Sequence, residues 1–361
     1  MLLFSLLFLR DITNNMAKFY TLTIQDLIQE TADAVSIVFT IPAEEQASFA
    51  FQAGQYVTLK ATIDGAEVRR AYSICSSPAS GTLKVAVKAV PNGVFSTYAT
   101  TKLKAGDLLE VSAPEGKFVL QPADGKRYLG IAAGSGITPV LSMVKATLED
   151  SEASFTLIYG NKTVEDTIFY QEINELQVKY ANRFTVDYVY SRARVEGSLN
   201  GRVDQGHINY LLKKYGEAAN FDAAFLCGPE EMIKIASSTL ETSGIPAGNI
   251  HYELFTASTS NDTEGVKDGE SQVKILLDDE EASFTMKQTD TILAASLRNK
   301  LDAPYSCQGG VCSSCIAKVT EGKAVMTKNS ILTDEELEEG LILTCVSHPT
   351  TPTITVDFDE V

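Results

Sequence analysis

The sequence predicts a multidomain fold in which an antiparallel β-barrel is followed by an α/β domain with a parallel sheet and then by a small α+β domain. Three observations support this order: short alternating apolar runs fill residues 19–120, strands and helices alternate up to residue 255, and a cysteine-rich loop lies near the C-terminus. The predicted boundaries are 16–122 for the barrel, 123–255 for the α/β domain, 256–271 for a linker and 272–361 for the last domain.

The barrel is predicted from apolar residues that alternate with polar ones, as at 20–24, 35–39 and 83–87. Turn-forming Gly, Pro, Asn and Asp residues separate these runs, for example at 64–65 and 91–93. Regularly spaced short strands of this kind favour an antiparallel barrel.

The α/β domain is predicted from a change of period after residue 126. Thr163 is a candidate N-cap, Pro229 a helix start and Gly244 a helix end. Strand and helix in alternation indicate a parallel sheet with helices on both faces. The predicted strands are 127–133, 155–159, 184–190, 223–226 and 250–254, and the predicted helices are 137–149, 164–180 and 229–243.

Residues 256–271 contain almost no large apolar side chain, so they are interpreted as a flexible polar linker. Beyond them the pattern predicts a small sheet with one helix. The predicted strands are 273–277, 283–286, 316–320 and 353–358, and the predicted helix is 291–300.

The most specific motif is the spacing of Cys307, Cys312 and Cys315, C-x4-C-x2-C, with Cys345 as a distant fourth thiol. Plant-type [2Fe-2S] clusters are held by four thiolates in this 3+1 order, and they carry one electron at a time. A structural zinc site is the alternative, although zinc modules usually show two short pairs of ligands. Some other group in the chain must supply the electrons.

The charge and the first residues limit the function further. A net charge of −17 argues against nucleic acid and against anionic membrane surfaces. Acidic runs at 278–281 and 334–339 are either solvated faces or docking surfaces. The apolar segment before Arg10 is too short to span a bilayer, so no stable membrane insertion is expected.

Met16 is the expected start of the protein, which makes residues 1–15 a non-native extension; an unusual signal peptide is the alternative. Cysteines that must stay reduced until they bind iron indicate the cytoplasm.

Arg70-Ala71-Tyr72-Ser73 ends a predicted barrel strand and suits a flavin. An Arg can bind a pyrophosphate with two hydrogen bonds, a Tyr can lie against the flavin, and a Ser hydroxyl can reach a ring nitrogen. Gly93-Val94-Phe95-Ser96 begins a helix and offers backbone N–H groups to phosphate. Taken alone, the motif at 70–73 is a weak signal, and an exposed Arg next to an edge-strand Tyr is the alternative.

Residues 134–139, GSGITP, follow a strand and open a helix, as a dinucleotide pyrophosphate site requires. The motif ends in Pro139 where glycine is usual, and a plain strand-to-helix turn is the alternative. Cys227-Gly228-Pro229 follows a later strand and places a small thiol where a nicotinamide could pass. A buried structural cysteine is the alternative there.

Taken in order, R-x-Y-S, GSGITP, CGP and HYELF resemble the ferredoxin-NADP reductase superfamily, and the last domain resembles plant-type, β-grasp-like ferredoxins. The segments RAYSICSSP, VKAVPNGVFSTY and PYSCQGGVCSSC are most similar to the reductase subunits of phenylacetyl-CoA epoxidase complexes. Reductases of fatty-acyl desaturases, Rieske oxygenases and steroid hydroxylases are related alternatives.

The resemblance implies a role for each motif residue. It implies FAD contacts at Arg70, Tyr72, Ser73, Gly93 and Ser96, with Ser73 near flavin N5. It implies catalytic positions at Ser73, Cys227 and Phe255, of which Phe255 approaches the flavin ring and Cys227 the nicotinamide. It implies NADPH contacts at Gly134, Gly136, Thr138, Pro139, Ser191, Arg192, Gly228 and Pro229.

Arg192 would bind the 2'-phosphate, which favours NADPH over NADH. The implied function is electron transfer from NADPH to FAD, then to [2Fe-2S], then to an oxygenase or desaturase component. Hydride transfer to the flavin depends on geometry rather than on an acid or a base. A non-catalytic interaction module that binds zinc is the alternative from another class.

Overall fold

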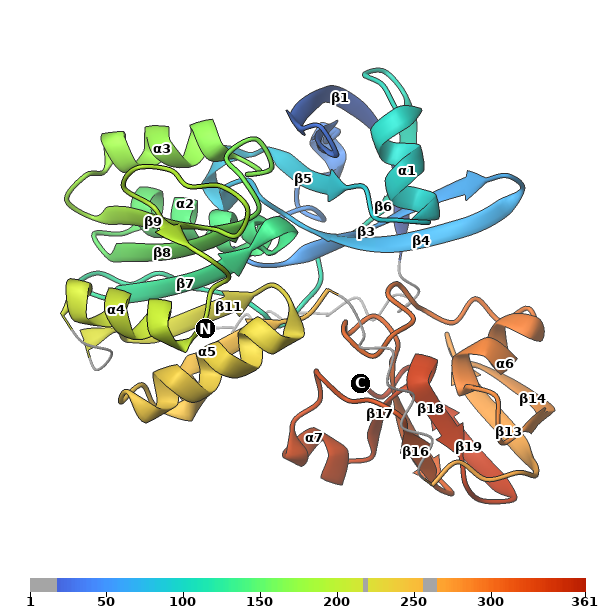
Figure 1. Ribbon diagram of the computed structural model, residues 1–361. Helices are drawn as coiled ribbons and strands as arrows, with labels where there is room; N and C mark the ends of the chain where they lie inside the picture. The colour runs from blue at the N-terminus through green and yellow to red at the C-terminus, as the bar shows by residue number, and fades with distance from the viewer. Residues whose placement is uncertain (1–17, 217–219, 256–264) are drawn as a thin grey trace, which may run out of the picture.

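The computed structural model describes residues 18–216, 220–255 and 265–361, which form three domains (Figure 1). The predicted extension 1–15 and residues 256–264 of the predicted linker lie outside these ranges. Within them, none of the helices combines the length and the apolar character that crossing a membrane requires.

The first domain is an antiparallel six-stranded sheet in the order β4-β3-β6-β1-β2-β5. A bridge between Ile74 and Val85 joins the two ends of this order, so the sheet closes into the predicted barrel. Its core includes Leu22, Ile37 and Leu59, which are fully buried. The elements are β1 Phe19–Thr31, β2 Ala34–Thr40, β3 Tyr56–Ile63, β4 Ala66–Ser73, β5 Leu83–Lys88, α1 Val94–Thr101 and β6 Leu108–Ser112.

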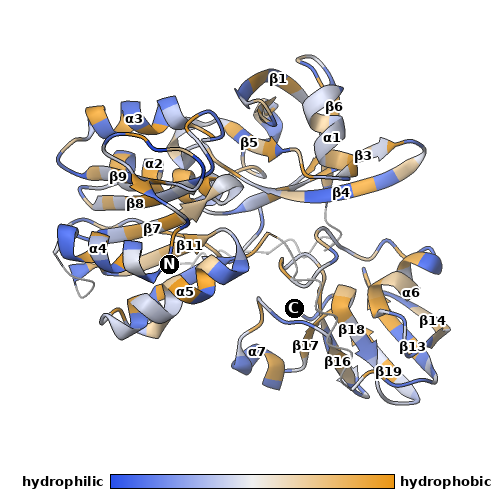
Figure 2. Cartoon of the chain, viewed as in Figure 1, coloured by the Kyte–Doolittle hydropathy of each residue, from blue (hydrophilic) through white to orange (hydrophobic). Residues whose placement is uncertain are grey.

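The second domain is a parallel sheet in the order β10-β9-β8-β7-β11-β12. Successive residues of β7 enter different cores: Tyr128 packs with residues of α2 and α3, whereas Leu129 packs with residues of α4 and α5. The strands are therefore apolar along most of their length (Figure 2). The elements are β7 Arg127–Ala133, α2 Ile137–Asp150, β8 Ser154–Asn161, α3 Tyr170–Lys179, β9 Phe184–Tyr190, β10 Leu199–Asn200, α4 Gln205–Tyr215, β11 Ala223–Cys227, α5 Glu230–Thr242 and β12 Ile250–Glu253.

Two helices differ from the prediction. Helix α3 begins at Tyr170 rather than at 164, because Thr163 accepts a hydrogen bond from the Asp166 amide in a separate turn. Helix α4 lies outside the predicted elements, although Asp204 caps it by accepting from the His207 amide at 2.9 Å.

The third domain is a five-stranded mixed sheet in the order β14-β13-β19-β15-β17, with a short pair of β16 and β18. Its core includes Ile275, Leu343 and Val356. Strand β13 begins at Glu270, inside the predicted linker, and β16, β17, β18 and α7 lie outside the predicted elements. The elements are β13 Glu270–Leu277, β14 Glu280–Lys287, α6 Ile292–Arg298, β15 Ile316–Glu321, β16 Ala324–Met326, α7 Asp334–Glu338, β17 Leu341–Leu343, β18 Ser347–Pro349 and β19 Thr353–Asp357.

Candidate functional site

The end of β4 brings the predicted flavin residues together. Ser73 is buried, whereas Arg70 is exposed and has no carboxylate partner among the described residues; its guanidinium donates only to the Arg69 carbonyl at 2.6 Å. The Tyr72 ring lies against Phe95 of α1, with ring centroids 5.6 Å apart. A free guanidinium beside an anchored aromatic ring suits a ligand that carries both phosphate and an aromatic system.

Helix α1 presents its N-terminus on the same domain. Its first backbone hydrogen bond runs from the Thr97 amide to the Gly93 carbonyl, so the amides of residues 94–96 have no partner within the helix. The Ser96 hydroxyl is engaged differently from the prediction, because it accepts from the Val90 amide at 3.3 Å and so holds the turn together. The free amides and Arg70 therefore fit a pyrophosphate, with Ser96 contributing through its backbone.

Glu253 lies within the HYELF segment, but no role was predicted for it. Cys227 and Glu253 face each other as register partners in β11 and β12, and the Ser73 hydroxyl donates to the Glu253 carboxyl at 3.4 Å. Burial raises the pKa of Glu253 to about 8, although the bond from Ser73 opposes this shift. Burial, and then Glu253, raise the pKa of the Cys227 thiol well above its usual value.

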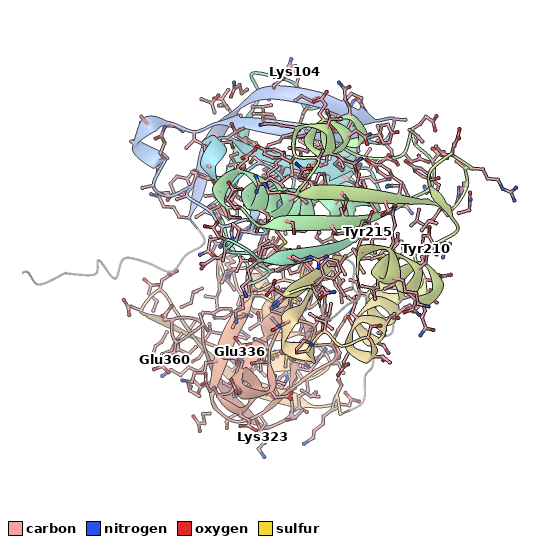
Figure 3. All side chains as sticks on the ribbon, turned by 90° about the vertical axis from the view of Figure 1, so that its left-hand side faces the viewer. Lys104, Tyr210, Tyr215, Lys323, Glu336 and Glu360 are labelled. Atoms are coloured by element: carbon pink, nitrogen blue, oxygen red, sulfur yellow. The ribbon has the colours of Figure 1, made fainter. Side chains whose placement is uncertain are left out.

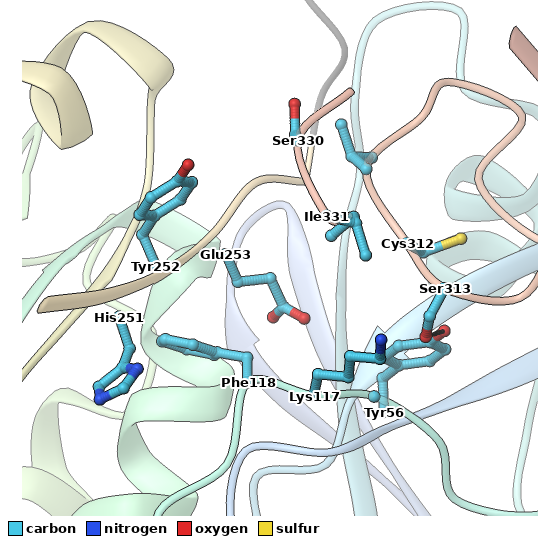
Figure 4. A pocket seen from close by; sticks show the side chains of 12 residues that line it. Tyr56, Lys117, Phe118, His251, Tyr252, Glu253, Cys312, Ser313, Ser330 and Ile331 are labelled. Carbon is cyan, nitrogen blue, oxygen red and sulfur yellow. Dashed lines mark hydrogen bonds between the residues drawn. The ribbon is translucent and has the colours of Figure 1, made fainter. Parts of the chain in front are cut away.

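A sequence signal for Glu253 does exist. It is an acid at the end of a predicted buried strand, next to the segment already singled out for Phe255. Glu253 also lines a small cavity of about 130 Å³ between the three domains, together with Tyr56 and Cys312 (Figure 4). The carboxyl thus lies between the predicted flavin site and the cysteine loop.

The glycine turn and the CGP turn meet at the carboxyl ends of the adjacent strands β7 and β11. A Cβ atom on Gly136 would lie 2.1 Å from the Cys227 carbonyl oxygen, so only glycine fits there. Gly134 has a φ of +55° and open space around it. Backbone therefore borders a cavity of about 700 Å³ here, a size typical of ligand pockets.

This cavity contains many of the residues predicted to contact the nucleotide, but not all of them. Thr138 and Pro139 are buried in α2 and do not line it, so their side chains shape the start of the helix instead. Cys227 is 0% exposed and does not line it either, which agrees with the alternative of a buried structural cysteine. The predicted residues that line the cavity are Gly134, Gly136, Ser191, Arg192, Gly228, Pro229 and Phe255.

Four cationic side chains line the same cavity, and one of them, Lys88, is paired with Asp33 at 3.6 Å. Lys162 follows β8, Arg192 follows β9 and Arg202 follows β10, and these strands are neighbours in the sheet. None of the three forms an ion pair within the described part of the chain. Only Arg192 was predicted; the position of Lys162, three residues beyond the predicted strand 155–159, was the available signal for a second cation.

The four predicted cluster cysteines converge. A hydrogen bond with Cys312, and then one with Cys345, lower the pKa of the Cys307 thiol, and a bond with Cys345 lowers that of Cys315. The Gly309 amide donates to Cys307 Sγ at 3.4 Å. Among the described residues no three His, Cys, Asp or Glu side chains are grouped to hold a single metal ion. The 3+1 order of the four thiols along the chain is the order that holds a [2Fe-2S] cluster, whereas zinc modules usually show two short pairs of ligands.

Family models match each domain. Residues 21–120 match an oxidoreductase FAD-binding domain, residues 131–238 an oxidoreductase NAD-binding domain, and residues 275–350 a 2Fe-2S iron-sulfur cluster binding domain. This chain belongs to the ferredoxin-NADP reductase superfamily, in the group that carries a C-terminal [2Fe-2S] domain.

Individual relatives extend the likeness over the whole chain. A component of 1,2-phenylacetyl-CoA epoxidase from Escherichia coli is 40% identical over 95% of this chain and 99% of the relative. The ferredoxin reductase component of 3-ketosteroid-9-alpha-monooxygenase from Rhodococcus rhodochrous is 32% identical over 93% and 96%. The fold of phthalate dioxygenase reductase covers 94% of this chain and 98% of that one, with a TM-score of 0.61 and 24% identity.

The protein is therefore an oxidoreductase that passes electrons from a pyridine nucleotide through FAD to a [2Fe-2S] cluster and on to an oxygenase. The cysteine loop packs against the second domain, since Val311 lies in the apolar core that also contains residues of α4 and α5. The Arg69 guanidinium of β4 also donates to Asp302 of the last domain at 2.8 Å.

Proposed function

We propose that this chain is the reductase component of a phenylacetyl-CoA epoxidase and that NADPH is its electron donor. The observation that carries the proposal is the 40% identity to a component of such an epoxidase over nearly the full length of both chains. The steroid monooxygenase component, which serves a different acceptor, is 32% identical over a similar length.

FAD is proposed to bind between the end of β4 and the start of α1. Arg70 and the free amides of residues 94–96 would hold the pyrophosphate of FAD. The Tyr72 ring would lie against the flavin, and the Ser73 hydroxyl would reach flavin N5. When bound, FAD accepts a hydride as two electrons and releases them singly. Phe255, at the edge of the nucleotide cavity, would cover the ring until the nicotinamide replaces it.

The groups beside Ser73 stay uncharged at neutral pH. Burial keeps the Glu253 carboxyl protonated, since its pKa is raised to about 8, and keeps the Cys227 thiol neutral. Hydride transfer moves negative charge toward the flavin, so two buried anions there would oppose it. A neutral Glu253 also leaves a hydrogen-bonding partner for Ser73.

The preference for NADPH is proposed from the charges of the nucleotide cavity. Lys162, Arg192 and Arg202 converge from three adjacent strands, and a phosphate ester attracts such a group of cations. Three acids share this lining. Asp204 accepts from the His207 amide, Asp166 accepts from the Thr163 hydroxyl at 3.1 Å, and Glu231 forms no ion pair with the three cations in the described part of the chain. The cations therefore remain available to the 2'-phosphate.

Reconstitution tests the choice of acceptor. The tagged full-length chain would be used to capture its oxygenase, and the pair would be assayed for NADPH-dependent consumption of phenylacetyl-CoA, a 3-ketosteroid and phthalate. The proposal expects consumption of phenylacetyl-CoA alone, with one NADPH oxidised per epoxide formed. Turnover of either other substrate with phenylacetyl-CoA untouched would reassign the acceptor and leave the reductase function in place.

A further inference from the structure

A hydroxyl of the barrel reaches into the cysteine loop of the third domain. Tyr56 opens β3 and is only 3% exposed. Its hydroxyl lies 3.1 Å from Ser313 Oγ and 3.0 Å from Ser314 Oγ, and these two serines separate Cys312 from Cys315. The contact therefore joins the first domain to the loop that holds the cluster, and Tyr56 and Ser313 face the same small cavity (Figure 4).

Glu115 completes this contact from the same side. Its carboxylate accepts from the Ser314 hydroxyl at 3.1 Å and from the Tyr56 hydroxyl at 3.4 Å. It has no ion-pair partner in the part of the chain that the structure describes. Burial raises the pKa of Glu115, and the two hydroxyls oppose the shift. Hydroxyls from two domains thus supply the hydrogen bonds that a buried carboxyl requires.

The Tyr56 side chain is held in place by its backbone surroundings. The Tyr56 amide donates to the Glu115 carbonyl at 2.9 Å, and the Glu115 amide donates back at 2.8 Å. Gly116, with a φ of +114°, passes so close that a Cβ atom there would lie 3.0 Å from the Tyr56 ring. The ring has little freedom to move, so it sets the position of whatever binds its hydroxyl.

The same residue is tied to the flavin side. Tyr56 and Ser73 are register partners in β3 and β4, so the residue that receives the cysteine loop sits directly across from the residue proposed to reach flavin N5. The route from Ser73 to Cys312 crosses one strand pair, the Tyr56 side chain and one hydrogen bond to Ser313.

We propose that Tyr56 and Glu115 are positioning residues for electron transfer, which hold the cysteine loop at a defined place beside the flavin. A hydride from the nucleotide would bring two electrons and one proton to FAD. The two electrons would leave one at a time through the cluster to the oxygenase, and the proton would go to solvent. The rate of electron transfer falls as the two centres move apart, so a cysteine loop that shifts away from the flavin would receive electrons more slowly.

The first test is Tyr56→Phe in the holoprotein, which removes only the hydroxyl. Mixing with NADPH should show flavin bleaching at the wild-type rate, followed by cluster reduction slowed roughly five- to thirty-fold, as the loss of one or two hydrogen bonds implies. The control is Tyr210→Phe, because Tyr210 is 56% exposed on the outer surface of α4 (Figure 3) and should leave both phases unchanged.

Ser314→Ala removes the same hydrogen bonds from the side of the third domain. It therefore tests the proposal even if the Tyr56→Phe variant does not retain FAD. It should slow the same phase, and the double variant should be no slower than the more affected single one, since both changes remove one network. Hydrogen exchange at amides 113–117 should rise in either variant at unchanged iron content. Additive effects, equal slowing of both phases, or wild-type cluster reduction in both variants would overturn the proposal.

Discussion

Replacing Glu253 by Gln tests the buried carboxyl through the pH dependence of stability. Glu253 is 9% exposed, and its pKa is raised from 4.5 to about 8. Between these two values the folded protein keeps a proton that the unfolded chain loses. The free energy of unfolding must therefore fall as pH rises through this window, by up to about 1.4 kcal/mol per pH unit.

Between pH 5 and pH 7.5 this slope lowers the free energy of unfolding of the FAD-loaded protein by roughly 3 kcal/mol in total. Gln resembles the protonated acid, so Glu253→Gln should match the wild type near pH 5 and exceed it by about that amount at pH 7.5. Denaturant unfolding followed by circular dichroism and flavin release measures the difference. The control is Glu241→Gln, an exposed position on α5. Parallel stability curves for Glu253→Gln and the wild type would refute the argument.

Three further outcomes are expected. Cys312→Ser should abolish cluster absorption while NADPH still bleaches the flavin, because Cys75 and Cys227 belong to other domains; a colourless wild-type protein with stoichiometric zinc would contradict this. Arg192→Ala should weaken the apparent affinity for NADPH more than that for NADH, by roughly 1.5 to 3 kcal/mol, as measured by steady-state kinetics. Equal effects on the two nucleotides would mean that the 2'-phosphate binds elsewhere. Neutralising Asp334, Glu335 and Glu338, which are exposed on α7, should slow reduction of the oxygenase at low salt but not flavin reduction; indifference to salt and to these changes would make the run a solvated face.

The acidic run 334–339 also contributes a contact between two domains of the chain. Glu336 lies inside it and forms an ion pair with Lys117 beside the barrel. Figure 3 labels Glu336 on the third domain, near the lower edge of the nucleotide-binding domain. The substitutions above spare Glu336, so a change in oxygenase reduction would not arise from loss of this pair.

Local patterns were enough to predict the three domains. Alternation of period two, buried apolar strands between helices and the cysteine spacing each follow from the geometry of a single element or loop. The strands 127–133 and 184–190 were predicted with their observed bounds. Helix α3 was predicted too long because Thr163 is a good cap for either a helix or a turn, and only the packing of residues 164–169 decides between them.

By itself the sequence determined the order of the cofactor domains and the residues at their turns, because glycines, prolines and thiols act within a few residues of chain. Only the tertiary structure decided which distant groups meet. Glu253 faces Cys227 and Ser73 because β12 pairs with β11 beside the barrel, and Tyr56 reaches Ser314 because the third domain docks there. Thr138 was excluded from the nucleotide cavity for the same kind of reason, since helix packing rather than sequence order decides which side of a turn is open. Contacts between segments far apart in sequence have no local pattern, so folding alone brings them together.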